Sequence, residues 1–354
     1  MSSDGLTIDS LRKIYAQPSN FWPKPNVDKE VKFEELAALQ PSPIDLTNDS
    51  IRHVVELGKL LFFDTRLSGA NQISCATCHN PELNWTDGMK VSIGHEQLEN
   101  IRNAPSLENV WVYNSFFWDG RANSLISQVE GPISAHNEMN QDLKSLSKKL
   151  SKIKDYRFYF KAAFGTAKIT NQRVFESLAT FQQTIVSQES NFDKFLKGDA
   201  NALTDQELTG LHLFRTKARC MNCHHGAYFT DKDFHNIGLT EYGTKREDLG
   251  LYNVTKRPED IGKFKTPGLR NVMKTGPWFH QGSVNSMDSL MVLYNMGMPE
   301  HVVLPGQEND PLLPKNDKLV RGIMLNVSER KALIAFLDAL SSPSIPLKVE
   351  RFPQ

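Results

Sequence analysis

The sequence predicts a mainly α-helical fold, built from two helical modules with long loops. Apolar residues recur at helical spacing in several segments, whereas the alternating pattern typical of strands is scarce. The motif Cys-x-x-Cys-His occurs twice, at residues 75–79 and 220–224, and each copy follows a segment with helical periodicity. We therefore expect the same kind of helical module in each half of the chain.

The predicted elements follow in chain order. Residues 1–45 contain five prolines without sustained periodicity, which predicts an extension that either wraps a core or hangs free. A helix is predicted from Ile51 towards the first motif, because its apolar residues share one face. Arg173–Lys197 is predicted to form a second helix in the same way. Thr204 and Glu207 form a capping box, which predicts a short helix that leads to the second motif.

Ser328 is predicted to cap a last helix whose apolar residues face inward. Long loops are expected from about 80 to 140 and from 225 to 290; such loops are usually functional or disordered. A length of 354 residues suggests roughly two domains. We expect an N-terminal extension and two domains, at residues 1–45, 46–189 and 190–354.

The composition bears on a few classes of function. Lys plus Arg and Asp plus Glu number 41 each, so the formal net charge is zero. This balance gives no argument for binding to nucleic acid or to an anionic membrane surface. No run of 18 or more apolar residues occurs, so no transmembrane helix is expected. The polar N-terminus, MSSDGLTIDS, does not resemble a signal peptide.

The two motifs use all four cysteines of the sequence. This pattern is typical of c-type haem attachment, in which two thioether bonds hold the haem and the histidine ligates its iron. A zinc site would not require the histidines, a thioredoxin-like pair would need a βαβ context, and disulfide frameworks are typical of shorter chains. We expect two covalently bound haem c groups, attached at Cys75, Cys78 and His79 and at Cys220, Cys223 and His224.

Four segments resemble the bacterial di-haem cytochrome c peroxidase and MauG family, in the family's order. They are GKLLFFDTRLSGANQISCATCH (58–79), RNAPSLENVWVYNSFFWDGR (102–121), GPISAHNEM (131–139) and FKTPGLRNVMKTGPWFHQGS (264–283). The resemblance covers roughly residues 50–345. It implies two cytochrome c-like α-helical domains, each with one haem, and calcium between them. Because haem is normally attached outside the cytoplasmic membrane, we expect a periplasmic protein whose precursor has an export signal absent from this sequence.

The resemblance implies that the N-terminal haem reacts with peroxide and that His79 is its proximal ligand. Gln128 and, ten residues later, Glu138 match the family's distal pocket, which Pro132 also lines. A carboxylate there can move a peroxide proton from one oxygen to the other; the alternative is that Glu138 lies in a solvated loop. His95, sixteen residues after His79, matches a histidine that caps the resting iron in many family peroxidases. The alternative is a surface histidine in a flexible loop.

Trp118 matches a family tryptophan that lies between the two haems, although a buried aromatic residue is usually plain core. The second haem has His224 and a sixth ligand, which is methionine in the family's peroxidases and tyrosine in MauG-type enzymes. Counting from Thr275 and Pro277 places this ligand at Tyr294, with Met296 as the alternative. A methionine raises the haem potential, whereas a phenolate favours ferric and higher states.

The resemblance also implies a calcium ion. Asn103 matches a side-chain ligand, and Thr275 and Pro277 match backbone-carbonyl ligands; oxygen donors suit this cation. His280 matches a family histidine between the domains.

Two functions follow from the resemblance. The first is reduction of hydrogen peroxide with electrons from a small donor protein, a cytochrome c or cupredoxin; family peroxidases are often homodimers. The second is a MauG-like reaction, in which peroxide oxidises side chains of a partner protein through a high-valent di-haem state. A pure electron-transfer cytochrome would not need Glu138 and is disfavoured.

The two complete motifs predict two covalently bound haems. Haem staining after denaturing electrophoresis should be positive, and the intact mass should equal the polypeptide plus two haems. Extraction of the haem by acidic acetone, or a mass with one haem, would contradict this prediction.

Overall fold

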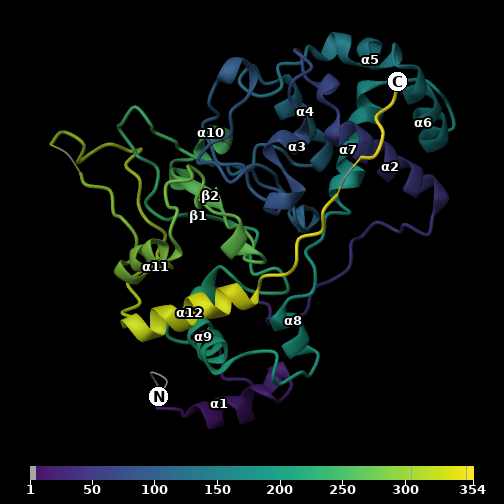
Figure 1. Ribbon diagram of the computed structural model, residues 1–354. Coiled ribbons are helices and arrows are strands. Elements are labelled where there is room, and N and C mark those ends of the chain that lie inside the picture. Colours follow the sequence, from purple (N-terminus) through teal and green to yellow (C-terminus); the bar gives the residue numbers. More distant parts are fainter. Residues whose placement is uncertain (1–4, 304, 348) are drawn as a thin grey trace.

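The computed structural model describes residues 5–303, 305–347 and 349–354. It is mainly helical, which confirms the predicted fold class (Figure 1). The α-helices are α1 Ile8–Tyr15, α2 Asp49–Phe63, α3 Cys75–Cys78, α4 Leu125–Ser134, α5 Leu143–Ser151, α6 Lys154–Phe164, α7 Asn171–Gln182, α8 Asn191–Leu196, α9 Asp205–Arg215, α10 Tyr252–Thr255, α11 Met287–Met296 and α12 Val327–Ala339. Two short antiparallel strands, β1 Phe234–Asn236 and β2 Lys263–Lys265, pair with Phe234 opposite Lys265.

Two helix pairs form the framework, α2 packed on α7 and α9 packed on α12 (Figure 1). Each pair touches at a glycine. A Cβ atom added to Gly58 in α2 would lie 2.0 Å from the carbonyl oxygen of Ser177, and one added to Gly210 in α9 would lie 2.0 Å from that of Ala332. Only glycine allows so close an approach of two backbones. The first helix of each pair precedes a Cys-x-x-Cys-His motif in the chain, so each helix crossing fixes where the segment that leads to the motif begins.

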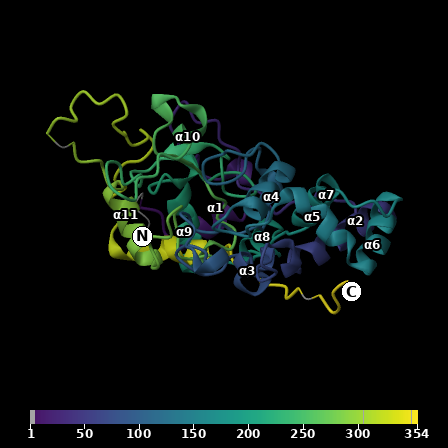
Figure 2. The same cartoon turned by 90° about the horizontal axis from the view of Figure 1, so that it is seen from above.

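The apolar side chains form two separate large cores. The first surrounds α2, α4 and α7 and includes the aromatic residues Phe62 and Phe181, and the second surrounds α9 and α12 and includes Phe214, Phe229 and Phe336. Figure 2 shows these two halves side by side, with α2, α6 and α7 at one end and α11 at the other. On this basis we propose the domain division at 46–189 and 190–354.

The N-terminal extension wraps the second half. Helix α1 buries Leu11 and Tyr15 in the core of α9 and α12, and the Tyr15 hydroxyl lies 3.0 Å from Nδ1 of His212. Further along, the backbone N–H of Asn26 donates to the carbonyl oxygen of Arg215. The sequence left open whether this segment would wrap a core or hang free, and it wraps one.

The C-terminal segment crosses in the opposite direction, from α12 to the first half (Figure 1). A guanidinium nitrogen of Arg66 donates to the carbonyl oxygen of Pro353 at 2.9 Å, and the N–H of Asp155 donates to that of Gln354 at 3.0 Å. None of the helices in the described part of the chain has the length and apolar character needed to cross a bilayer.

Several predicted boundaries were right or wrong for local reasons. The capping box of Thr204 and Glu207 opens α9 as predicted. The single helix predicted over Arg173–Lys197 is wrong, because the chain leaves the helix after α7 and starts α8 at a new cap, Ser190. The cap of α12 is Asn326 and not Ser328, because Asn326 and Glu329 make a reciprocal capping box.

The two predicted long loops are more structured than the sequence indicated. The first contains α4, and the second contains β1, β2 and α10. Turns with backbone hydrogen bonds, such as that from Asn80 N–H to the carbonyl of Thr86, hold the remainder in place.

The contact at Gly58 generates a stability prediction. Alanine favours a helix over glycine by about 1 kcal/mol, but its methyl group would overlap the carbonyl oxygen of Ser177. We expect Gly58→Ala to lower the free energy of unfolding by about 1–3 kcal/mol, the usual range for overpacking. Denaturant unfolding measures this, with the exposed Glu56→Ala in the same helix as control. Equal stabilities of the two variants would show that α2 can move away from α7 without loss.

Candidate functional site

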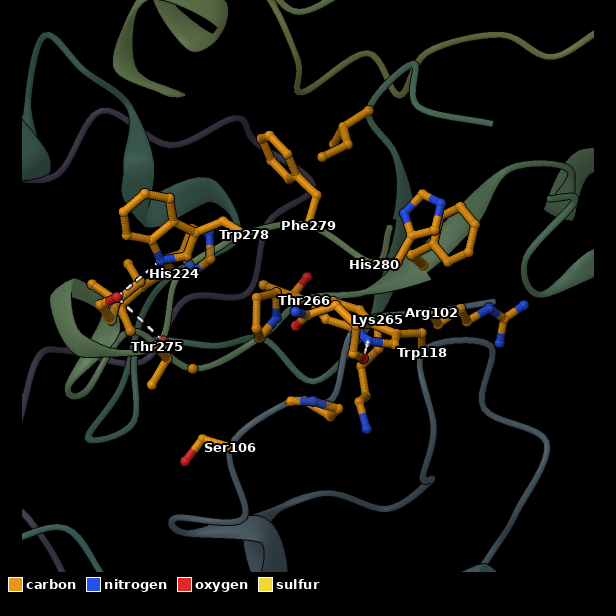
Figure 3. Close-up of a pocket in the computed structure, with 18 of the residues that line it drawn as sticks. Arg102, Ser106, Trp118, His224, Lys265, Thr266, Thr275, Trp278, Phe279 and His280 are labelled. Atoms are coloured by element: carbon orange, nitrogen blue, oxygen red, sulfur yellow. Dashed lines mark hydrogen bonds between the residues drawn. The ribbon is translucent and has the colours of Figure 1, made fainter. Parts of the chain in front are cut away.

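Both haem motifs open onto one cavity between the two halves of the protein. The cavity has a volume of about 810 Å³, and its wall includes Cys78 and His79 from the first motif and Cys220, Cys223 and His224 from the second. Cys75 lines a smaller adjoining cavity of about 70 Å³, which Cys78 and His79 also line. Figure 3 shows part of the large cavity, with His224 and Thr275 on one side and Trp118 and His280 on the other.

The two motif histidines are held in the same way. Nδ1 of His79 lies 3.0 Å from the carbonyl oxygen of Trp85, and Nδ1 of His224 lies 2.9 Å from that of Phe229. A carbonyl only accepts hydrogen bonds, so Nδ1 carries the proton and Nε2 keeps its lone pair. Burial lowers the pKa of both histidines, which favours the neutral form that ligates metals. Both side chains therefore suit a proximal haem ligand.

The four cysteines form no disulfide with one another. Burial raises the pKa of Cys75 to about 12, that of Cys78 to about 11 and that of Cys220 to about 12. Cys75 packs with the first core and Cys220 with the second, which does not favour one shared zinc site. Two attachment sites on one large cavity fit two c-type haems.

Glu138 and Gln128 come together at the first motif. Both side chains line the cavities that also contain Cys78 and His79, and so does Pro132 in α4. Burial raises the pKa of Glu138, while a hydrogen bond from Asn100 and the charge of Arg121 act in the opposite direction. Glu138 is therefore not in a solvated loop, and its environment suits a group that gains and loses a proton.

His95 lies next to this pocket but does not line it. Its backbone N–H donates to the carbonyl oxygen of Glu138 at 2.9 Å. Its ring centre is 5.7 Å from that of His136, and Nε2 lies 3.5 Å from a carboxylate oxygen of Glu96. The backbone of Glu96 is left-handed, with φ of 54°. The role of His95 as an iron ligand stays a prediction.

Trp118 lines the same cavity as both motifs. Its indole Nε1–H donates to the carbonyl oxygen of Asn103 at 2.9 Å, and its ring centre lies 6.5 Å from that of His280. His280 stacks on Phe264 at 3.5 Å, and burial lowers its pKa to about 3, so it is neutral. Trp118 is thus a fixed aromatic group on the wall of the cavity (Figure 3).

Tyr294 and Met296 occupy different faces of α11. Tyr294 lines the cavity together with Cys220 and Cys223, and burial raises its pKa. Met296 is 76% exposed. Side chains two residues apart on an α-helix point in directions that differ by about 200° around the helix axis. Tyr294 and Met296 therefore cannot face the same cavity.

The three residues expected to bind calcium, Asn103, Thr275 and Pro277, all line the large cavity. The amide nitrogen of Asn103 donates to the carbonyl oxygen of Met89 at 2.9 Å, which directs the amide oxygen away from Met89. The backbone N–H of Asn103 donates to the carbonyl oxygen of His280 at 2.7 Å. An amide oxygen and backbone carbonyls are suitable donors for this cation.

Sequence reasoning missed a network of charges beside Trp118. Arg102 lies 2.7 Å from carboxylate oxygens of both Asp119 and Asp248 and is almost completely buried. Lys265 in β2 lines the cavity near them. The sequence carries no local signal for this network, because Arg102 and Asp248 are 146 residues apart.

Comparison with known proteins agrees with this geometry. A family profile described as "Di-haem cytochrome c peroxidase" matches residues 52–201. The chain is 35% identical to the cytochrome-c peroxidase IdrP2 of Denitromonas iodatirespirans, over 85% of this chain and 84% of that protein. It is also 35% identical to the methylamine utilization protein MauG of Methylorubrum extorquens, over 90% of this chain and 89% of that protein.

Among solved structures, the fold is similar to that of a MauG-like protein associated with microbial copper homeostasis. The TM-score is 0.75 at 28% identity, covering 89% of this chain and 95% of that one. The two motifs, the shared cavity and these relatives over most of the chain lead to one conclusion. The chain belongs to the di-haem cytochrome c peroxidase family.

Proposed function

We propose that this protein reduces hydrogen peroxide at the haem of His79, using electrons that enter at the haem of His224. The observation that carries this proposal is the position of Glu138 and Gln128 on the cavity of the first motif. When bound, the two haem c groups would supply the redox chemistry. Several relatives are named cytochrome-c peroxidases.

Glu138 would move the proton. A carboxylate can accept the proton of one peroxide oxygen and return it to the other, which helps to break the O–O bond. Burial raises its pKa, so Glu138 keeps a proton to a higher pH than an exposed glutamate would. Gln128 would orient peroxide by hydrogen bonding, and Trp118 would bridge the two haem sites.

The electron donor in this proposal is a small cytochrome c or cupredoxin. The protein would form a homodimer and would be located in the periplasm. Calcium would be held by Asn103 with the carbonyls of Thr275 and Pro277, all on the same cavity. Its role would be to tie Asn103, whose carbonyl oxygen accepts the hydrogen bond of the Trp118 indole, to the second half.

A second candidate is a MauG-like reaction, in which peroxide oxidises side chains of a partner protein. It is favoured by one observation: Tyr294 faces the cavity of the second motif, whereas Met296 is exposed. Two relatives are named MauG, at 34% and 35% identity.

The position of Glu138 generates the first prediction here. Glu138→Gln should slow the reaction with peroxide by about 10²–10⁴-fold, because it removes a general acid–base group. Stopped-flow mixing with peroxide measures this, and haem content should stay unchanged. Glu130→Gln, an exposed position in α4, is the matched control. A Glu138→Gln rate within about threefold of wild type, far below that range, would make Glu138 a bystander.

We also propose that His95 caps the iron of His79 in the resting ferric enzyme. Electron paramagnetic resonance should then show two low-spin haems in wild type and a high-spin signal in His95→Gly. His136→Gly, which removes the neighbouring ring, should resemble wild type. A strong high-spin signal in wild type that His95→Gly does not change would refute the role of His95.

The faces of α11 generate a prediction on potential. An anionic phenolate stabilises ferric iron, so Tyr294→Phe should raise the potential of the second haem. Met296→Leu should leave it unchanged, because that side chain faces solvent. Spectroelectrochemistry of the two variants separates these cases. A high-potential couple that persists in Tyr294→Phe and is lost in Met296→Leu would assign the ligand to Met296 and favour the ordinary peroxidase reaction.

A further inference from the structure

The cavity wall around Trp118 contains two arginines that are paired with aspartates and one lysine, Lys265. Arg102 lies 2.7 Å from both Asp119 and Asp248, and Arg121 lies 3.0 Å from Asp119. Lys265 is the third cation, and neither aspartate forms an ion pair with it. Both carboxylates are already engaged by the arginines. The unmatched charge is therefore that of Lys265.

Lys265 is fixed next to Trp118. Its backbone N–H donates to the carbonyl oxygen of Trp118 at 2.9 Å, and its Nζ donates to that of Ser115 at 3.0 Å. Nζ also lies 4.3 Å from the ring centre of Tyr113. The side chain lines the large cavity (Figure 3). The ion pairs found within the described ranges do not include Lys265.

Keeping the Lys265 ammonium group charged in this site has a high free-energy cost unless an anion lies next to it. Loss of water lowers the pKa of Lys265 to about 8, which the charge of Asp119 only partly opposes. One carbonyl and one aromatic ring replace part of the hydration of a cation but not a counter-charge. The group that fills this cavity should therefore bring a negative charge to Lys265.

We propose that Lys265 binds a propionate carboxylate of one of the two haems, through a charge-assisted hydrogen bond from Nζ. Each haem carries two propionates, and both haem motifs open onto the cavity that Lys265 lines. The proposal rests on the assignment of two haems in the proposed function. An ammonium–carboxylate pair in a site shielded from water is stronger than a neutral hydrogen bond.

The pair would also act on Trp118. An uncompensated ammonium group on the residue whose backbone N–H is bonded to Trp118 opposes removal of an electron from nearby aromatic side chains, by simple Coulomb repulsion. A propionate that neutralises Lys265 removes this repulsion from the aromatic group between the haem sites. Lys265 is thus a haem-binding and positioning residue, which ties strand β2, Trp118 and the cofactor together.

The same strand provides a matched control. Lys263, two residues earlier in β2, is paired with Asp260 at 3.1 Å. Its charge is therefore already balanced by protein, unlike that of Lys265. Lys263→Met and Lys265→Met remove the same charge from the same strand.

The test compares these two variants and Lys265→Arg as complete, haem-loaded proteins. Midpoint potentials come from spectroelectrochemistry, and propionate bending modes come from resonance Raman spectra. Lys265→Met should lower the potential of one haem, because a cation that disfavours ferric iron is lost, and should shift its propionate modes. Lys265→Arg should keep both near wild type, and Lys263→Met should change neither.

The outcomes separate this inference from the proposed function. If Lys265→Met matches Lys263→Met in potentials and propionate modes while both turn over peroxide, Lys265 does not bind propionate and the proposed function stands. If the wild type lacks covalent haem, both fail. If Lys265→Met and Lys265→Gln fail to load haem while Lys265→Arg loads it, the need for a cation supports the inference; failure of all three variants contradicts it.

Discussion

The backbone of α2 approaches α7 so closely at Gly58 that the carbonyl oxygen of Ser177 occupies the space where a side chain would begin. The same contact recurs between Gly210 of α9 and the carbonyl oxygen of Ala332 in α12. Because neither contact can be loosened or tightened without moving a whole helix, each sets where the following motif lies. The orientation of His79 and His224, and hence of the cavity between them, depends on these two crossings.

The polar groups on this cavity are of two kinds. The motif histidines are held neutral, because burial lowers their pKa while a backbone carbonyl engages Nδ1. The groups around Trp118 are instead charged, and one of their ion pairs, that of Arg102 with Asp248, joins the two halves. Removing one partner of such a pair leaves a buried charge, which is far more costly than the pair itself is stabilising. The interface between the halves is therefore selective about how they align.

The sequence was informative where the signal is local. The two motifs, the box of Thr204 and Glu207, and the helical content follow from residues near each other in the chain. The single helix predicted across Arg173–Lys197 was wrong because the helical spacing of apolar residues continues only to Ile185. Residues 184–187 are Thr, Ile, Val and Ser, which are weak helix formers, and tertiary hydrogen bonds such as that between Asn109 and Ser187 hold the chain outside a helix there.

At the site, the family resemblance selected Glu138, Trp118 and Tyr294, and all three line the cavity. The ion pair of Arg102 with Asp248 and the unpaired charge of Lys265 could not be predicted. The partner of a charged side chain is known only once the fold has brought distant segments together. That Tyr294 faces the cavity could be inferred only by counting from the KTGPWFHQG motif. Tyr294 and Met296 are both hydrophobic, so the weak helical periodicity of α11 does not show which of them faces inward.

The two ends of the chain each complete the opposite half. Tyr15 packs in the core of α9 and α12, while the backbone N–H of Asp155 in α6 donates to the carbonyl oxygen of Gln354. Closing contacts such as Tyr15 with His212, 197 residues apart, has a large loop-entropy cost and slows folding. The segment around Tyr15 cannot pack until the second half has been made, and the contact of Asp155 with Gln354 forms only after residue 354 has been made. Each half thus provides the packing surface for the terminal segment of the other half. We therefore expect the two halves to complete their folding together and not one after the other.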